Sequence, residues 1–255
     1  MRYRIKNKEV VYDLIEPPKD KNLKKGIILF PGMPNQPHNE DSDIFASEGF
    51  YVLEPRYIGS WESYGEFNMD NCIKTVVEAE KLFQRGFANE CWSNKKIKWD
   101  IDEIIILSSS FGSSIVLSIA HELKTKKFVC LAPLTNLKKH NRDKKIEEQD
   151  LKQLGLFIKR GFENAFRGFN LSDWNIFIQG KSKANPIGVT DLLKDKNIFL
   201  AHGKKDSVIH YSRTQEYFDK IKDKNKIKLK FYENIGHGKQ VKKASFRDVL
   251  DWIKE

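Results

Sequence analysis

Short apolar runs alternate along this chain with stretches whose apolar residues recur at helical spacing. A run such as Ile104 to Leu107 is bulky throughout, which is typical of a strand buried on both faces of a sheet. The pattern predicts strands at residues 2–5, 9–15, 26–30, 50–53, 103–107, 128–131, 197–202 and 227–232. It predicts helices at residues 41–47, from residue 70 onward, and at 111–123, 211–221 and 241–254.

The regular alternation of strands and helices predicts the α/β class. We expect a mostly parallel central sheet with helices on both faces, opened by an antiparallel hairpin around Asn7. In such sheets, functional residues lie beyond the carboxyl ends of the strands. The search for chemistry therefore concentrates on the segments that follow each predicted strand.

Residues 135–185 break this rhythm. The segment begins with a charged stretch, residues 138–148, and then becomes apolar and aromatic. We interpret it as a small helical cap insertion that divides the core into residues 1–134 and 186–255. The helical spacing of Phe162, Phe166 and Phe169 predicts that one helix presents all three. The aromatic side chains either contact the substrate or pack the insertion onto the body, and both alternatives stay open.

Ser110 is the candidate nucleophile. It lies in the segment Ser108 to Gly112, between a predicted strand and a predicted helix. This arrangement is typical of a nucleophile elbow, a sharp turn that lifts a serine out of the sheet and needs small neighbours to avoid a backbone clash. Ser108 stands where a glycine is usual, and it is small enough to take that place.

An acid and a base follow in the order that this chemistry requires. Asp206 lies beyond the strand at 197–202, and His237 lies beyond the strand at 227–232. The order Ser, Asp, His is that of the α/β-hydrolases. His237 is expected to accept the serine proton, and Asp206 to orient the imidazole. The competing loop, which follows the strand at 128–131, offers no carboxylate before Asp143.

An oxyanion hole needs two backbone N–H groups. Phe111, which follows the nucleophile, is expected to supply one, and the loop after the strand at 26–30 the other. In that loop the prolines have no N–H, which leaves Gly32 and Met33. We favour Met33 because the proline after it restricts its backbone to extended conformations. The cap and the loop at residues 54–67 are expected to shape the substrate pocket.

Composition and charge narrow the class of protein. The chain has 255 residues, of which 40% are hydrophobic, enough for one large globular core. Its formal net charge is +10, but the lysines are spread over the whole chain. The densest run, residues 220–230, places lysines outward on a predicted terminal strand without interleaved aromatic residues. This pattern is typical of protection against edge-to-edge aggregation and predicts no nucleic-acid partner.

Other signals are missing from the sequence. It has no apolar run long enough to span a bilayer, no secretion signal at its start, and three scattered cysteines. We therefore expect a cytoplasmic protein with reduced thiols, in which Cys72 and Cys130 are core residues. No motif for a metal, nucleotide or phosphate is present, so no cofactor is expected. The oligomeric state is left open.

Four of the other five histidines receive structural roles. His202 precedes a glycine at the end of a predicted strand, where we expect it to shape the loop that carries the acid. His38 and His121 have no partners at ligand spacing, and His140 lies in a charged run, so all three are predicted to lie at the surface.

With these residues in place, the chain resembles the α/β-hydrolase superfamily over nearly its whole length. Several segments resemble the catalytic domain of prolyl-oligopeptidase-like (S9) serine hydrolases and their small esterase relatives. They are residues 30–36, 55–67, 201–206 and 236–238, together with the turn at Ser110. Two departures bear on activity. The chain has no room for the propeller domain that many of these peptidases carry, and Phe30 stands near the place where many have a tyrosine that donates to the oxyanion hole.

The resemblance and the candidate residues together predict a serine hydrolase that acts through an acyl-enzyme intermediate. Because Phe30 cannot donate a hydrogen bond, we expect hydrolysis of a small or medium carboxylic ester. The alternatives are hydrolysis of a short peptide or amide and, from another class, a non-catalytic binding protein with the same fold.

Overall fold

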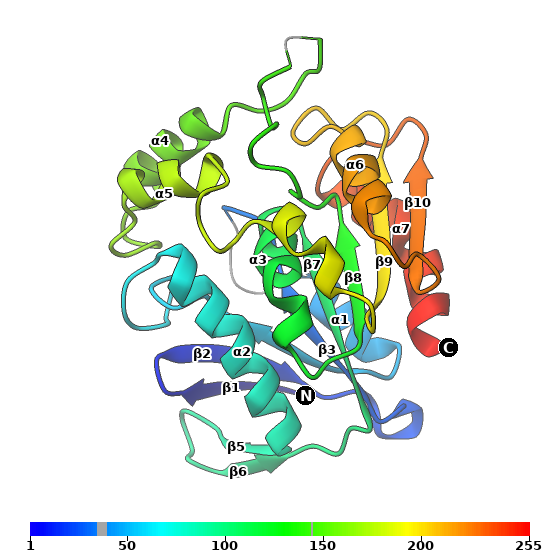
Figure 1. Ribbon diagram of the computed structural model, residues 1–255. Helices are drawn as coiled ribbons and strands as arrows, with labels where there is room; N and C mark the ends of the chain where they lie inside the picture. Colours follow the sequence, from blue (N-terminus) through cyan, green and yellow to red (C-terminus); the bar gives the residue numbers. More distant parts are fainter. Residues whose placement is uncertain (35–39, 144) are drawn as a thin grey trace.

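The computed structural model describes residues 1–34, 40–143 and 145–255, and an eight-stranded sheet forms its centre (Figure 1). The strands of this sheet are β1 (Arg2–Asn7), β2 (Val10–Ile15), β3 (Lys25–Phe30), β4 (Tyr51–Pro55), β7 (Glu103–Ser109), β8 (Lys127–Leu131), β9 (Asn197–Gly203) and β10 (Ile227–Tyr232). Their spatial order is β1-β2-β4-β3-β7-β8-β9-β10. The pairings β1–β2 and β2–β4 are antiparallel, and all the others are parallel. The predicted fold class and opening hairpin are confirmed.

Helices cover both faces of the sheet, as predicted. They are α1 (Glu40–Ser47), α2 (Met69–Arg85), α3 (Phe111–Ile119), α4 (Leu151–Gly161), α5 (Leu171–Ile178), α6 (Ser212–Lys220) and α7 (Lys239–Lys254), with short 3₁₀ turns at Lys19–Lys21, Ala120–Glu122, Pro186–Gly188 and Thr190–Leu192. Apolar side chains of α1 and α7 share one core cluster, and those of α2, α3 and α6 share the other, on the opposite face (Figure 1). The sheet between them is buried on both sides, which explains its continuous apolar strands.

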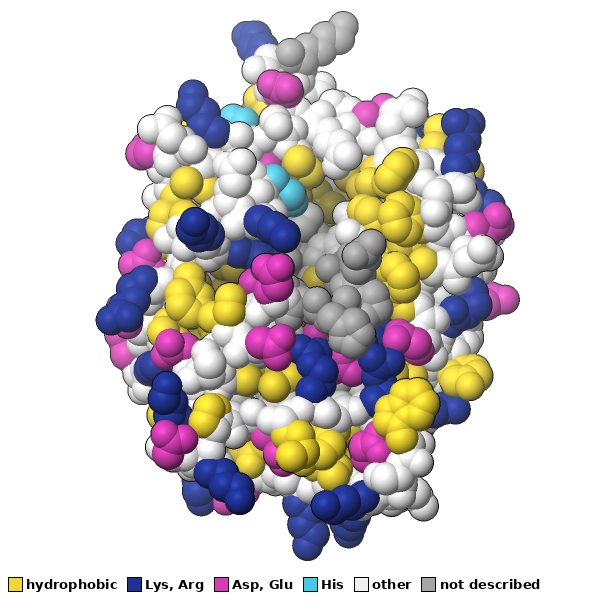
Figure 2. Space-filling view, turned by 180° about the vertical axis from the view of Figure 1, so that it is seen from behind, with side chains coloured by type: hydrophobic (Ala, Val, Ile, Leu, Met, Phe, Trp, Pro, Cys, Tyr) yellow, Lys and Arg dark blue, Asp and Glu magenta, His cyan; other side chains and the backbone are white. Residues whose placement is uncertain are grey.

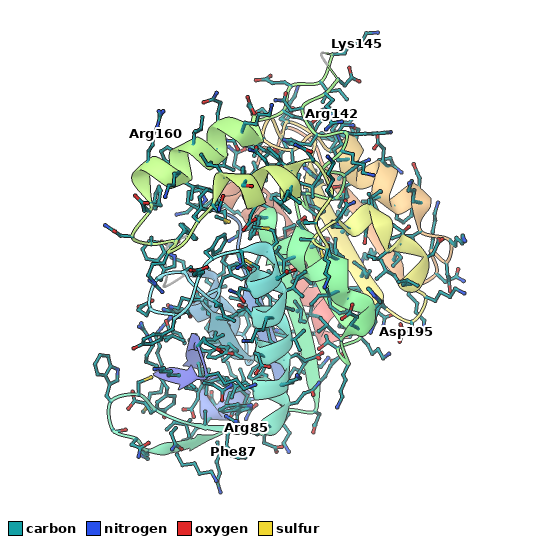
Figure 3. All side chains as sticks on the ribbon, turned by 60° about the vertical axis from the view of Figure 1, so that its left-hand side comes forward. Arg85, Phe87, Arg142, Lys145, Arg160 and Asp195 are labelled. Carbon is teal, nitrogen blue, oxygen red and sulfur yellow. The ribbon has the colours of Figure 1, made fainter. Side chains whose placement is uncertain are left out.

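A small hairpin was not predicted. The strands β5 (Phe87–Asn89) and β6 (Lys96–Lys98) pair antiparallel and form a separate two-stranded sheet. Each strand buries only its central residue, so the alternation is too short to stand out in the sequence. Figure 3 shows Arg85 and Phe87 at the end of the molecule opposite to Arg160 on α4. The hairpin is therefore remote from the segment predicted to cap the site.

The prediction of one helix carrying three phenylalanines is wrong. The helix α4 ends at Gly161, and Phe162 caps it, so Phe166 and Phe169 lie beyond its end. The chain leaves the helix because its backbone pairs with a distant loop. Trp61 N donates to Ala165 O at 2.8 Å, and Arg167 N donates to Gly59 O at 2.8 Å.

The structure bears on the predictions for single histidine and cysteine residues. His140, predicted at the surface, is buried with 6% exposure, because its Nε2 lies 2.8 Å from Gln149 O and its Nδ1 lies 3.3 Å from the Glu148 carboxylate. His38 lies outside the described residues. Cys72 and Cys130 are buried, as expected.

In the described part of the chain, no helix combines the length and apolar character that a membrane crossing requires.

A buried charge cluster fixes the antiparallel edge of the sheet. The Asp13 side chain on β2 is 1% exposed and accepts from Arg56 Nη2 at 2.9 Å, Arg4 Nε at 2.7 Å and Arg2 Nη1 at 3.1 Å. Burial acts to raise the pKa of Asp13, but the neighbouring guanidinium groups outweigh it and lower the pKa. Arg56 is itself only 3% exposed, and its carboxylate partners are the buried Asp13 and, at 3.1 Å, the half-exposed Glu62.

We predict that Asp13→Ala lowers the free energy of unfolding by about 3 kcal/mol, because it removes the buried carboxylate from the Arg56 guanidinium and leaves it with Glu62, which is 43% exposed. Asp43→Ala is the matched control. Asp43 also pairs with Arg2 but is 68% exposed, so its loss should cost less than about 0.5 kcal/mol. Urea denaturation of both variants measures the difference, and equal midpoints would contradict the role given to Asp13.

Candidate active site

Ser110 occupies a strained turn between β7 and α3. Its backbone has φ +50° and ψ −120°, a left-handed combination that non-glycine residues seldom adopt. Gly112, two residues further, lies so close to the end of β3 that a Cβ atom there would stand 2.2 Å from Phe30 O. The predicted sharp turn is therefore present, and its tight packing requires glycine at position 112.

The serine in place of the usual first glycine is accommodated by hydrogen bonds. Ser108 is fully buried, and its Oγ lies 3.0 Å from Ser113 Oγ and 3.3 Å from Val129 O. These contacts satisfy the hydroxyl within the turn and tie β7 to α3 and to β8. Ser108 therefore has a structural role beneath Ser110.

Asp206 and His237, predicted as acid and base, form a short hydrogen bond. His237 Nδ1 lies 2.6 Å from Asp206 Oδ2. Asp206 follows β9 and is 2% exposed, while His237 follows β10 in the loop before α7. Because the carboxylate accepts from Nδ1, the other nitrogen of the His237 ring is left to exchange protons with a substrate or a nucleophile.

His202 supports the same carboxylate from inside the protein. Its Nε2 lies 3.1 Å from Asp206 Oδ2 and 2.8 Å from Ile209 O, and its Nδ1 lies 2.7 Å from Thr214 Oγ1. The other carboxylate oxygen, Asp206 Oδ1, accepts from the backbone N–H groups of Val208 and Ile209, each at 2.9 Å. His202 thus shapes the acid loop, as its sequence position suggested.

These contacts keep Asp206 ionised. Burial alone would raise the pKa of its carboxyl, but the hydrogen bonds and charges of His202 and His237 outweigh burial and hold the pKa well below its usual value. An ionised carboxylate at this position can stabilise an imidazolium at His237.

Ser110 and His237 line one open cavity of about 410 Å³. Its apolar wall comes mainly from the side chains of Leu134, Leu151, Leu154, Phe157, Trp174 and Ile209, with Gln149 and Gln153 as polar members. Figure 2 shows hydrophobic side chains gathered along one side of a hollow, with a histidine on its other side. The structure joins His237 to Asp206 by a hydrogen bond and places Ser110 at the same cavity. Within the described residues, Ser110 Oγ has no hydrogen-bond partner, so no hydrogen bond links the serine to His237 here.

The loop after β3 lies beside the serine. A Cβ atom on Gly32 would stand 3.0 Å from Ser110 Cβ, and Met33 lines the cavity together with Ser110 and Phe111. In the described part of the chain, neither Met33 N nor Phe111 N donates to another protein group. Both predicted donors are therefore near the serine and available, and their role in binding an oxyanion stays a prediction.

The loop at residues 54–67 does not line this cavity. Its residues Glu54, Arg56 and Trp61 instead line a separate hollow of only about 20 Å³, to which Met33 also contributes. Met33 lines both hollows, so this loop lies next to a residue that is expected to donate to the oxyanion. The loop's residues are absent from the described lining of the cavity at Ser110, and its influence on substrate binding stays a prediction.

Several cavity residues were missed by sequence reasoning. Val208 and Ile209 follow Asp206 in the acid loop, so their position beyond a strand could have indicated them. Gln149 and Gln153 carry no comparable signal, because they precede and begin α4 and reach the cavity only through the tertiary fold. Among the described residues, no group of histidine, cysteine and carboxylate side chains could hold a metal ion.

Comparison with solved structures agrees with this fold. An α/β hydrolase from Penicillium sp. sh18 is similar with a TM-score of 0.68 and 15% identity, over 100% of this chain and 98% of that chain. An esterase from Pyrococcus furiosus has a TM-score of 0.66 and 17% identity, over 100% of this chain and 88% of that chain. A puromycin-hydrolyzing peptidase from Mycobacterium tuberculosis has a TM-score of 0.67 and 16% identity, over 100% of this chain but 38% of that chain.

No curated protein matches the chain. The model of the prolyl oligopeptidase family matches residues 39–255, which include the Ser110 turn, the Asp206 loop and His237. With this match over most of its length and the fold described above, the chain belongs to the prolyl oligopeptidase family of serine hydrolases.

Proposed function

We propose that this protein hydrolyses small or medium carboxylic esters through an acyl-enzyme intermediate, with Ser110 as nucleophile, His237 as general base and Asp206 as the acid that orients it. One observation carries the proposal: the 2.6 Å bond between His237 Nδ1 and Asp206 Oδ2 lies next to a cavity that both His237 and Ser110 line. A nucleophilic serine needs such a base, and the base needs a third group to orient it.

In the proposed reaction, Ser110 Oγ attacks the ester carbonyl while His237 Nε2 accepts the serine proton. Met33 N and Phe111 N donate to the carbonyl oxygen as it becomes negative, and Asp206 stabilises the imidazolium. The ester C–O bond breaks and His237 returns the proton to the leaving alcohol. Water, deprotonated by the same imidazole, then attacks the acyl-enzyme and releases the carboxylic acid and Ser110.

The character of the cavity supports an ester with an uncharged acyl group. Among the described residues that line it there is no aspartate, glutamate, lysine or arginine, so none of these side chains would form an ion pair of that kind with a charged substrate end. The family and the structural neighbours include both esterases and peptidases, so they leave this choice open. Phe30 favours esters, because its buried ring cannot donate to an oxyanion.

Hydrolysis of short peptides or amides is the second candidate. It is supported by the peptidase family and by the similarity to the puromycin-hydrolyzing peptidase. A non-catalytic binding role is the third candidate, and it would leave the acid–base pair without a use.

Ser110→Ala is expected to abolish covalent labelling by a fluorophosphonate probe and to lower kcat for p-nitrophenyl esters by at least about 10⁴-fold, because the nucleophile is lost. Ser109→Ala, a change at the neighbouring buried serine, is the matched control and should keep the label. Labelling of folded Ser110→Ala would place the nucleophile elsewhere.

The pH–rate profile should have one ascending limb. The pKa of Asp206 lies below its usual value, so the carboxylate stays ionised as the pH falls and adds no second proton to the acid limb, while the general base must be neutral to accept the serine proton. Hydrolysis should therefore decrease on the acid side with a slope of one proton. A slope of two protons between pH 4 and 7 would contradict the ionised state assigned to Asp206.

Phe157→Ala should reduce kcat/KM for medium-chain p-nitrophenyl esters by about 10-fold and change the acetate less than about twofold, because the lost ring contacts only the longer acyl chain. Ile176→Ala is the control, since Ile176 on α5 is 45% exposed, close to the 55% of Phe157, but does not line the cavity. Equal losses for all chain lengths would remove Phe157 from the acyl site.

A further inference from the structure

Glu148 is a buried carboxylate that the proposed reaction does not use. It ends the charged stretch before α4, and its side chain is 0% exposed. Arg213 on α6 donates to it through Nε at 3.0 Å and Nη2 at 2.9 Å, and Asn141 N donates at 2.8 Å. His140 Nδ1 lies 3.3 Å away. Burial alone would raise the pKa of Glu148, but the adjacent His140 ring and the hydrogen bonds from Arg213 lower it to about 2.

The same carboxylate contacts the end of the acid loop. His210 N donates to Glu148 Oε1 at 3.2 Å, and the next residue after the glutamate, Gln149, donates from its backbone N–H to Val208 O at 3.1 Å. Residues 148–149 therefore bind the backbone of Val208 and of His210, the residues on either side of Ile209 in the chain. The N–H groups of Val208 and Ile209 are the ones that hold Asp206 Oδ1.

One requirement follows from these contacts. The acid loop must keep two backbone N–H groups aimed at Asp206, or the carboxylate turns away from His237. Glu148 and Gln149 hold that loop through His210 N and Val208 O, and His202 holds it through Ile209 O. Because Gln149 also lines the cavity, the same contact joins the substrate pocket to the acid.

We propose that Glu148, clamped by Arg213, is a positioning residue that holds the 206–210 loop so that the Asp206 carboxylate meets His237 Nδ1. The inference rests on the proposed function for its kinetic consequence, but the geometry it claims exists whether or not the protein hydrolyses esters. Glu148 contacts no reacting atom and acts through the loop.

The test is Glu148→Gln, which keeps the size of the side chain and removes its charge. One amide oxygen cannot accept from His210 N, Arg213 and Asn141 N together, so the loop should loosen. The matched control is Glu216→Gln. Glu216 binds the same arginine, at 3.3 Å, but from the solvent side and without any recorded contact to the acid loop among the described residues.

We expect kcat of Glu148→Gln for p-nitrophenyl acetate to fall about 10-fold with KM within about twofold, while Glu216→Gln stays near wild type. A second readout is the low-field proton resonance of the His237 Nδ1–H···Asp206 bond, assigned by its loss in Asp206→Asn. This resonance should broaden or move in Glu148→Gln and persist in Glu216→Gln.

The outcomes separate the two proposals. A wild-type protein that neither binds a fluorophosphonate nor cleaves esters would end the proposed function, and the resonance would still decide the role of Glu148. Unchanged kcat and an unchanged resonance in folded Glu148→Gln would overturn that role, even if the urea midpoint falls. If Glu148→Gln does not fold, Glu148→Asp, which keeps the charge but shortens its reach, takes its place with the same two readouts.

Discussion

The candidate site depends on one buried carboxylate. Asp206 accepts from the imidazoles of His202 and His237 and from two backbone N–H groups, so both of its oxygens are satisfied while the side chain is only 2% exposed. A buried carboxylate without such partners would take up a proton and could no longer stabilise an imidazolium. The order of the acid loop is therefore the condition for the proposed chemistry, and the loop's contacts with Glu148 and α6 extend that condition to distant parts of the chain.

The parallel sheet brings the three candidate residues to one edge. The strands β7, β8, β9 and β10 are successive parallel neighbours, so the segments that follow β7, β9 and β10 emerge on the same side. Ser110, Asp206 and His237 lie in those segments. The strained turn at Ser110 and the close approach of Gly112 to β3 place the serine beside the Met33 loop. The chemistry proposed for this protein follows from a topology in which crossover helices return the chain to the same edge.

The segment at residues 135–185 gives the site its apolar side. Its helices α4 and α5 contribute Leu154, Phe157 and Trp174 to the cavity, and Trp174 is held by a hydrogen bond from its Nε1 to Leu151 O at 2.7 Å. The sequence left open whether the aromatic residues of this segment contact the substrate or pack the segment onto the body; packing is present, and contact with a substrate stays a prediction. Phe157 faces the cavity, whereas Phe166 is buried against the loop that contains Trp61. We propose that this segment acts as the cap of the site.

The sequence by itself indicated the eight strands of the central sheet, most helices and the candidate residues Ser110, Asp206 and His237, because hydrophobic period and residue order are local properties of a chain. It also indicated the small residues of the Ser110 turn, where steric limits apply within a few positions. The end of α4, the burial of His140 and the contacts of Glu148 were decided only by the tertiary structure. Each depends on hydrogen bonds between segments remote in sequence, as between Ala165 and Trp61 or Glu148 and Arg213, and a local pattern carries no record of its distant partner.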